Sequence, residues 1–301
     1  MAKDTIKHLV TYSDVINIRL PIWEGLVRLK INMKKILSVL FFCLMTITMS
    51  AQKSAILVVQ FGTSNDEGRA AALDVLFSDI KARYPQYEVR EAYTSPTIRR
   101  ILAKKNVKKD SATDALLRLH LDGYDKVYVM PTFLLDGVEM NMLRDDVRGV
   151  EKFFKEVKVG NPILYQIEDF HAVADLLTQK SLCKKEAVMY VGHGNKFASS
   201  GAYSMLCQIM KQKGSYFVGT IEGWPDLDAS VDMIDTKAYK QVSVVPLLLA
   251  SGVHVREDID GEWRPAFEKK GFKVEVSFKG LGEDKAFREF IIGHLEELLK
   301  D

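Results

Sequence analysis

The segment KVYVMPTFLLDGVE at residues 126–139 recurs as QVSVVPLLLASGVH at residues 241–254, which is 115 residues further along the chain. Two more pairs keep this offset, namely Lys158-Val159 with Lys273-Val274 and Glu168-Asp169 with Glu283-Asp284. A constant offset over about 45 residues favours an internal duplication over one chance match. The chain therefore contains two related halves.

The earlier parts of the halves also correspond. AILVVQFGTS at residues 55–64 matches AVMYVGHGN at residues 187–195, and YEVREAYTSP at residues 87–96 matches YFVGTIEGWP at residues 216–225. The offsets of 132 and 129 require only loops of different length. Each half thus has four short apolar runs rich in Val and Ile, which predict strands.

Stretches with helical spacing separate these runs. Their predicted buried faces are Leu73, Leu76, Phe77, Ile80 and Tyr84; Leu143, Val147, Val150, Phe153 and Phe154; and Phe287, Phe290, Ile291, Leu295 and Leu298. Apolar strands that alternate with helices are typical of a parallel sheet covered on both faces. We expect a duplicated α/β fold of two doubly wound parallel-sheet lobes, residues 53–178 and 179–301, with an active-site cleft between them. Sites in such sheets form outside the carboxyl ends of the strands.

The N-terminal part has the features of a secretory signal peptide. Met33-Lys34-Lys35 precedes the uncharged run ILSVLFFCLMTITM at residues 36–49, and the small residues Ser50 and Ala51 follow. The run is shorter than the roughly 20 residues of a membrane-spanning helix. We expect a signal peptide over residues 33–51, cleavage near Ala51, a true start at Met33 with residues 1–32 upstream of it, and a periplasmic protein without a membrane span. An uncleaved anchor is the alternative.

Composition sets further bounds. The 301 residues are 47% hydrophobic with only eight prolines, which is enough to bury a full core. Residues 1–51 hold seven Lys or Arg and three Asp or Glu, so their removal changes the net charge from +2 to about −2. No basic patch indicates nucleic-acid binding. Cys183 and Cys207 remain in the mature chain, and the spacing leaves a disulfide and two thiols equally open. A homo-oligomer also stays open.

The matched strand ends differ in chemistry between the halves. In the second half they hold His193, Glu222 and His254, and in the first half the same places hold Phe61, Tyr93 and Glu139. Two imidazoles and a carboxylate from three strands form a plausible site for a divalent metal with open coordination positions. Such a site can pass the ion to another acceptor, and imidazole can also accept protons from pyrrole N–H groups. The second half is therefore expected to carry the metal ligands.

Structural explanations compete with each of these roles. The glycines beside His193 could serve only a strand-to-helix turn, and Glu222 could cap the helix that follows it. Phe61-Gly62-Thr63-Ser64 lies at a strand-to-helix junction, where backbone N–H groups of Thr63 and Ser64 could bind a substrate carboxylate. A tight turn with a Ser or Thr N-cap explains this segment equally well.

Several motifs together resemble a known family, and they keep its order along residues 53–300: QFGTS, EAYTSPTIRRIL, GYDKVYVMPTFLLDGVE, VGHGN, IEGWPDLD, VPLLLASGVHVRED and GLGED. This set resembles the anaerobic sirohydrochlorin cobaltochelatases of the CbiK type, class II chelatases related to ferrochelatase. The resemblance implies a two-lobed chelatase fold that inserts Co²⁺ into sirohydrochlorin, with Fe²⁺ as the alternative metal.

The resemblance also implies roles for individual residues. It assigns the metal-binding and proton-accepting histidine to His193, the second histidine to His254, an acidic partner to Glu222 and the first-lobe acidic residue to Glu139. Apart from the resemblance, the matched strand ends and the strand-to-helix junction lead us to expect that Phe61, Thr63, Ser64 and Tyr93 contact the substrate. Asn195-Lys196-Phe197 stands where the family often has further histidines. Export is the larger departure, because cobalamin-type synthesis is expected in the cytoplasm.

Two other functions remain open at this point. One is a periplasmic chelatase that inserts iron into a tetrapyrrole or removes it. The other is a non-catalytic periplasmic protein that carries a tetrapyrrole or a metal. The two classes differ in turnover, because a carrier binds one equivalent whereas an enzyme produces metallated ring in excess of protein.

Overall fold

A computed structural model describes residues 15–22, 25–32, 53–179, 182–252 and 255–300. The chain divides into two compact units, residues 1–52 and 53–301. The predicted signal peptide at residues 33–51 and the predicted ligand His254 lie outside the described residues.

In the first unit the structure describes an antiparallel hairpin. Its strands β1 (Val15–Ile22) and β2 (Gly25–Asn32) pair along their whole length, with Val15 opposite Asn32 and Ile22 opposite Gly25.

The second unit begins with a four-stranded parallel sheet in the order β4-β3-β5-β6. Its strands are β3 (Ser54–Gln60), β4 (Glu88–Tyr93), β5 (Lys126–Pro131) and β6 (Glu156–Val159). Its helical segments are α2 (Asp66–Gly68), the π-helix η1 (Arg69–Leu73), α3 (Asp74–Arg83), α4 (Pro96–Lys104), α5 (Ala112–Leu121), α6 (Val138–Val150), the 3-10 turn η2 (Glu151–Phe153) and α7 (Ile167–Leu177).

A second parallel sheet follows, in the order β10-β9-β7-β8. Its strands are β7 (Glu186–Gly192), β8 (Tyr216–Thr220), β9 (Gln241–Pro246) and β10 (Lys273–Val276). Its helical segments are η3 (Ala198–Ser200), α8 (Gly201–Lys213), α9 (Leu227–Asp232), the π-helix η4 (Val255–Trp263), α10 (Arg264–Lys269), η5 (Leu281–Glu283) and α11 (Lys285–Lys300). The two sheets have the same strand order when each strand is matched to its repeat, which confirms the predicted α/β fold.

Helices cover both faces of the first sheet, and β3 shows why its sequence is continuously apolar. Ala55, Leu57 and Val59 belong to a core with residues of α5 and α6, whereas Ile56 and Val58 belong to a core with residues of α3 and α11. All five side chains are fully buried. Because neighbouring side chains on a strand point to opposite faces, both faces need apolar residues.

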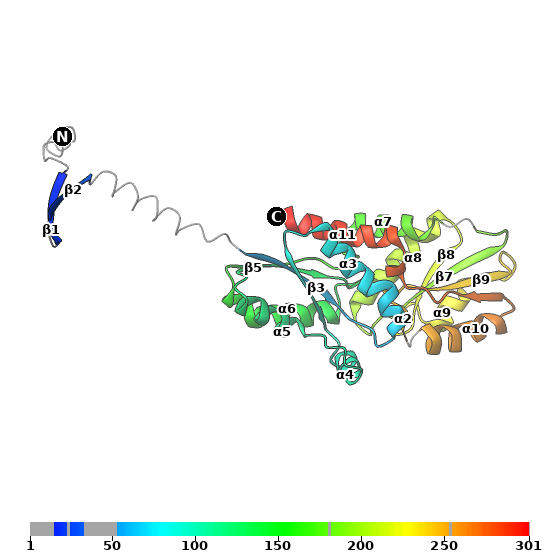
Figure 1. Cartoon of the computed structure of the whole chain (residues 1–301). Helices are drawn as coiled ribbons and strands as arrows, with labels where there is room; N and C mark the ends of the chain where they lie inside the picture. The colour runs from blue at the N-terminus through cyan, green and yellow to red at the C-terminus, as the bar shows by residue number, and fades with distance from the viewer. Residues whose placement is uncertain (1–14, 23–24, 33–52, 180–181, 253–254, 301) are drawn as a thin grey trace, which may run out of the picture. The chain divides into compact units, whose positions relative to one another are not determined.

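Two helices pack outside the half in which they occur in the sequence. The last helix, α11, contacts β5 and α7, and Figure 1 shows it beside α3 and α7. Arg83 on α3 pairs with Glu289 and Glu296 on α11, and Arg288 pairs with Asp79. In turn, α7 contacts α8 of the second half.

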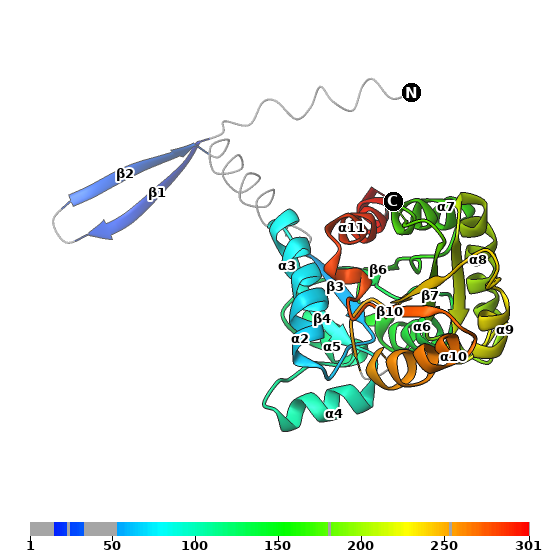
Figure 2. The same cartoon turned by 90° about the vertical axis from the view of Figure 1, so that its right-hand side faces the viewer.

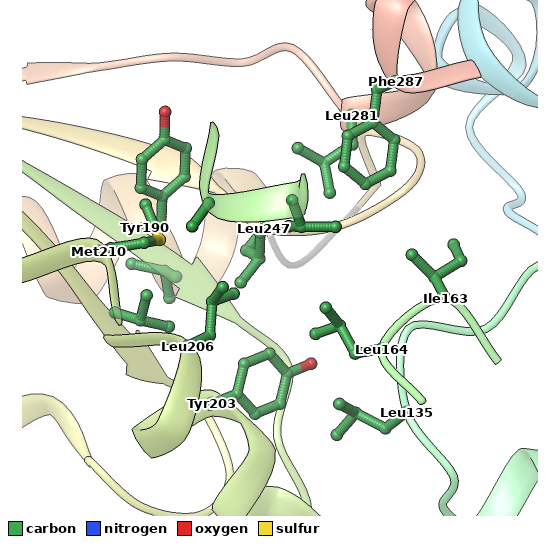
Figure 3. Close-up of a cluster of buried hydrophobic side chains, with 14 of the residues drawn as sticks. Leu135, Ile163, Leu164, Tyr190, Tyr203, Leu206, Met210, Leu247, Leu281 and Phe287 are labelled. Carbon is green, nitrogen blue, oxygen red and sulfur yellow. The ribbon is translucent and has the colours of Figure 1, made fainter. Parts of the chain in front are cut away.

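One hydrophobic core therefore spans both sheets. Leu135 and Leu164 of the first half belong to the same buried cluster as Tyr203, Leu247 and Phe287 of the second half. Figure 3 shows Tyr203 on α8 pointing toward Leu135 and Leu164. This shared core fixes the strand-end loops of the two sheets against one another.

The predicted helical faces are buried or, at Phe77, Phe154 and Phe290, partly buried, with one exception. Leu76, Leu143, Val147 and Leu295 have no more than 3% of their surface exposed. Phe153, predicted on the α6 face, is 45% exposed. The reason is that α6 ends at Val150 and the tighter 3-10 turn η2 changes the side-chain spacing.

Candidate active site

The carboxyl ends of β7 and β8 bring His193 and Glu222 together. The N–H of Ile221 donates to the carbonyl of Gly192 at 3.0 Å, and the N–H of Glu222 donates to the carbonyl of His193 at 2.7 Å. Both bonds lie just beyond the ends of the two strands. Because they join the loops through the backbone, they fix the position of His193 relative to Glu222.

Glycines allow this close approach. Gly194 has φ +73°, and a Cβ atom there would lie 2.1 Å from the carbonyl oxygen of Glu222. A Cβ atom at Gly192 would lie 2.3 Å from the ring of Tyr203. Gly223 has φ +137° and would meet Ser200 Oγ at 2.6 Å. Only a residue without a side chain fits these positions.

A backbone hydrogen bond defines the tautomer of His193. Its Nδ1 atom lies 3.0 Å from the carbonyl oxygen of Gly194. A carbonyl accepts but cannot donate, so Nδ1 carries the proton, and in neutral imidazole the lone pair is on Nε2. Metal-binding histidines commonly donate their second ring N–H to a backbone carbonyl in this manner. His193 is half-buried.

Glu222 does not cap the helix that follows it. The N-cap of α9 is Asp226, whose Oδ1 accepts the N–H of Ala229 at 2.9 Å. The capping explanation for Glu222 is therefore wrong. Its side chain is exposed, and a carboxylate oxygen is a ligand that divalent cations accept.

Glu139 approaches the second sheet from the first. It stands in the first turn of α6, where the helix dipole favours a negative charge. A Cβ atom at the preceding Gly137 would lie 3.4 Å from Asn195 Nδ2 and 3.5 Å from Ser199 Oγ. The loop before α6 therefore packs against the loop that carries His193.

Tyr203 on α8 links these two loops, and the sequence patterns did not single it out. Burial raises the pKa of its hydroxyl, the carboxylate of Glu139 acts in the same direction, and a hydrogen bond with the Gly194 backbone opposes them. Tyr203 is 3% exposed. In the sequence it is indistinguishable from the apolar residues of α8 beside it, because only the fold places Gly194 and Glu139 against it.

The structure describes the chain up to Gly252, two residues before His254. A Cβ atom at Gly252 would lie 3.5 Å from Thr63 Oγ1, and one at Gly68 would lie 2.1 Å from the carbonyl oxygen of Ser251. The segment that leads to His254 therefore packs on the loop after β3. The joint placement of His193, Glu222 and His254 on one metal ion stays a prediction.

The residues predicted to contact substrate differ in accessibility. Phe61 is 49% exposed, whereas Thr63 is buried and its Oγ1 accepts the N–H of Asn65 at 3.2 Å. Ser64 is half-buried and its carbonyl accepts a hydrogen bond from Lys105. Asn65 is the N-cap of α2, because its Oδ1 accepts the N–H of Gly68 at 2.9 Å. Neither Thr63 nor Ser64 has this role.

Tyr93 has no exposed surface. Its ring lies directly behind Gly62, where a Cβ atom would meet it at 2.4 Å, and the ammonium of Lys109 lies 4.9 Å from the ring centroid. Tyr93 therefore supports the Phe61-Gly62 loop from beneath. Its direct contact with substrate stays a prediction.

Several exposed apolar side chains stand in the loops that follow strands. Among the described residues these are Phe61 after β3, Phe197 after β7, Trp224 after β8 and Phe278 after β10. Exposed apolar surface of this kind marks a binding region.

A groove of about 500 Å³ opens beside this region. Asp136, Tyr165 and Ile167 line it from the first half, and Ser199 and Met205 from the second. Ser199 also hydrogen-bonds to Asn195, two residues after His193. The groove therefore adjoins the loop that carries His193.

Other chemistry is limited in the described part of the chain. Cys183 is exposed and Cys207 is buried, and both are free thiols. No group of three or more His, Cys, Asp or Glu side chains is arranged to hold a metal ion among the described residues, which do not include His254. Within the same residues, no helix has the length and apolar character needed to cross a bilayer.

Solved structures place the fold in the chelatase class. SirB from Bacillus subtilis with Fe³⁺ superimposes with a TM-score of 0.61 at 15% identity, over 82% of this chain and 95% of that one. The two parallel sheets thus have the same fold as that chelatase.

Sequence relatives define the family. The model of the cobalt chelatase family, CbiK, matches residues 54–300. The sirohydrochlorin cobaltochelatase of Salmonella typhimurium is 29% identical over 255 residues, which is 82% of this chain and 97% of that protein. Sirohydrochlorin cobaltochelatase CbiKC of Nitratidesulfovibrio vulgaris is 29% identical over 253 residues, or 81% and 89% of the two chains. The chain belongs to the cobalt chelatase family.

Proposed function

We propose that this protein inserts Co²⁺ into sirohydrochlorin and releases two protons. The observation that carries the proposal is the backbone hydrogen bond between His193 and Glu222 at adjacent strand ends. The loop of His193 also packs against the loop before α6, the helix that carries Glu139. Family membership supports the reaction type. The chain is thus a metal chelatase, with Co²⁺ and the tetrapyrrole as its substrates.

The residues suit the two tasks of the reaction. His193 presents the Nε2 lone pair, and Glu222 adds a negative charge that favours a divalent cation. When Co²⁺ passes from these ligands to the four ring nitrogens, two pyrrole N–H protons must leave. The imidazole that has released the metal can then accept one of them. His254 is proposed as the third ligand and Glu139 as an acceptor on the opposite side.

The flat apolar ring needs a surface of matching chemistry. Phe61, Phe197 and Trp224 are each about half or more exposed and stand at strand ends of both sheets. They supply aromatic surface, and the groove beside Ser199 supplies a concave one. Aromatic side chains stack on flat π-systems at little entropic cost. We place the ring in this region, with its nitrogens toward His193.

We also propose that the protein is exported. The support is the Lys34-Lys35 start, the apolar run to Met49 and the small residues Ser50 and Ala51. Mass spectrometry of a periplasmic fraction is expected to find an N-terminus near Gln52. A soluble product that retains Met33 or Met1 would contradict export. A homo-oligomer stays a prediction, which light scattering on the purified protein tests.

Spectrophotometric metal insertion tests the function. The assay compares Co²⁺ with Fe²⁺, and sirohydrochlorin with a protoporphyrin, at substrate in large excess over protein. We expect cobalt-sirohydrochlorin to accumulate over many turnovers. Faster insertion of Fe²⁺ would point to an iron chelatase. Product formation that stops at one molecule per protein molecule would point to a carrier.

A further inference from the structure

Unpartnered buried polar atoms gather at one corner of the first sheet. At the carboxyl ends of β3 and β4, Gln60 Oε1, Tyr93 Oη, Thr94 Oγ1 and Arg99 Nε are buried without a hydrogen-bond partner. They are half of the atoms of this kind in the described part of the chain. Because a buried polar group without a partner is costly, such a concentration indicates a ligand or water that completes it.

Thr94 and Arg99 are the two members that follow β4 in the chain. Thr94 directly follows β4, and its N–H donates to the carbonyl of Gln60 at 2.9 Å. The N–H of Ser95 donates to the carbonyl of Phe61 at 3.3 Å. The corner is therefore tied through the backbone to Phe61, the exposed aromatic residue after β3.

Thr94 and Arg99 flank the first turn of α4. Ser95 is the N-cap, and its Oγ accepts the N–H of Ile98 at 3.3 Å. Thr94 is the residue before the cap and Arg99 is the fourth helical residue, two positions whose side chains commonly pack together. Apolar residues usually occupy them, whereas here they hold a hydroxyl and a guanidinium.

The acidic residues Asp66 and Glu91 are already paired with cations other than Arg99. Asp66 pairs with Arg69 and Lys105. Glu91 is buried and pairs with Lys109, which opposes the increase in the pKa of Glu91 caused by burial. No acidic residue occurs between Pro96 and Lys109, where six Lys or Arg stand. Arg99 thus has a positive charge that no carboxylate of the described residues neutralises.

We propose that Arg99 and Thr94 bind a peripheral carboxylate of the tetrapyrrole, an inference that rests on the proposed function. Sirohydrochlorin carries acidic side chains around a flat ring, and a guanidinium with a hydroxyl beside it is a donor set for one carboxylate. Figure 2 shows α4 at the periphery of the unit, beyond the first sheet. That position suits a group at the edge of the ring rather than its metal-binding centre. Arg99 then determines specificity for polycarboxylate tetrapyrroles.

Equilibrium binding tests the inference without requiring turnover. Quenching of tryptophan fluorescence measures the Kd of uroporphyrin, with eight carboxylates, and coproporphyrin, with four. We expect Arg99→Gln to weaken uroporphyrin binding about tenfold or more, as for loss of a charged hydrogen bond. Arg100→Gln is the matched control, because Arg100 is an exposed neighbour on the same helix, and its Kd should change less than about twofold.

Thr94→Val provides a second, independent readout. Removing a buried hydroxyl that has no partner should leave the melting temperature unchanged or raise it, because the desolvation cost disappears. Binding of uroporphyrin should nevertheless weaken. A purely structural role for Thr94 would instead lower the melting temperature and leave the Kd unchanged, which overturns its part in the site.

The outcomes separate this inference from the proposed function. Wild-type Kd in Arg99→Gln, equal losses in Arg99→Gln and Arg100→Gln, or a wild-type chain that binds neither porphyrin would overturn the carboxylate site. Arg99→Gln with a raised KM for sirohydrochlorin and a kcat close to wild type would support it. A chain that binds uroporphyrin through Arg99 yet inserts no Co²⁺ would support the carboxylate site and refute the chelatase activity.

Discussion

The N–H of Glu222 donates a 2.7 Å hydrogen bond to the carbonyl oxygen of His193. This bond joins two proposed metal ligands through the backbone, so their spacing depends on how closely the two loops approach. Gly194 permits that approach, because any Cβ atom there would collide with the Glu222 carbonyl.

Replacing Gly194 with Ala should therefore separate the two loops. A Cβ atom 2.1 Å from a backbone oxygen, together with φ +73°, should lower the free energy of unfolding by about 2 to 4 kcal/mol. Urea denaturation measures this change. Gly149→Ala is the control, because no atom lies within 4 Å of its Cβ position in α6, and it should gain about 0.5 to 1 kcal/mol. Similar changes in both variants would contradict the assigned constraint.

His193→Ala should abolish cobalt insertion and leave the fold intact. The substitution removes the Nε2 lone pair but little buried surface, since His193 is half-buried at a strand end. We expect a fall in kcat/KM of at least about a hundredfold, measured from initial rates, with an unchanged circular dichroism spectrum. His171→Ala, on the exposed face of α7, should keep wild-type activity. Wild-type turnover in His193→Ala would refute the role.

Glu222→Gln should weaken metal binding more than ring binding. The amide keeps the size of the side chain but removes the negative charge that attracts the cation. Co²⁺ titration should give a Kd raised about tenfold, while uroporphyrin quenching stays close to wild type. Equal loss of both affinities would show that Glu222 supports the ring site instead.

The sequence predicts the two sheets well because the duplication repeats their strongest signals. The match between residues 126–139 and 241–254 corresponds to β5 and β9, which hold equivalent places in the two sheets. The packing of α11 onto the first half was not predictable, because it depends on α3 and β5, far away in the sequence. An amphipathic pattern shows that one face of a helix is buried, but it does not show which element packs against that face.

Only those site residues were predictable whose side-chain chemistry and strand-end position both indicate a function. His193 and Glu222 stand at strand ends in both the sequence and the structure. Tyr93 occupies a strand end too, yet it is fully buried, because Gly62 leaves room for its ring. Periodicity gives the face of a strand, whereas the direction of a side chain beyond the strand depends on its neighbours.

Tyr203→Phe tests whether the two halves are coupled at the site. The Tyr203 hydroxyl hydrogen-bonds to the Gly194 backbone and interacts with Glu139, so it connects the His193 loop with the first half. Burial raises its pKa, so the hydroxyl stays protonated at neutral pH and should add no ionisation to the pH–rate profile between about pH 6 and 9. Phe keeps the ring that packs against Gly192. We expect a kcat about tenfold lower, with a melting temperature within a few degrees of wild type.

The control for this coupling is Leu206→Ala on the same helix. Leu206 is fully buried, so its truncation should cost about 2 to 5 kcal/mol of stability. Because Leu206 has no polar contact with the site, the kcat of its folded fraction should match wild type. If Tyr203→Phe also loses stability without any loss of kcat, Tyr203 acts only through packing. If its kcat falls while its stability is kept, the hydroxyl positions His193 and Glu139 for the reaction.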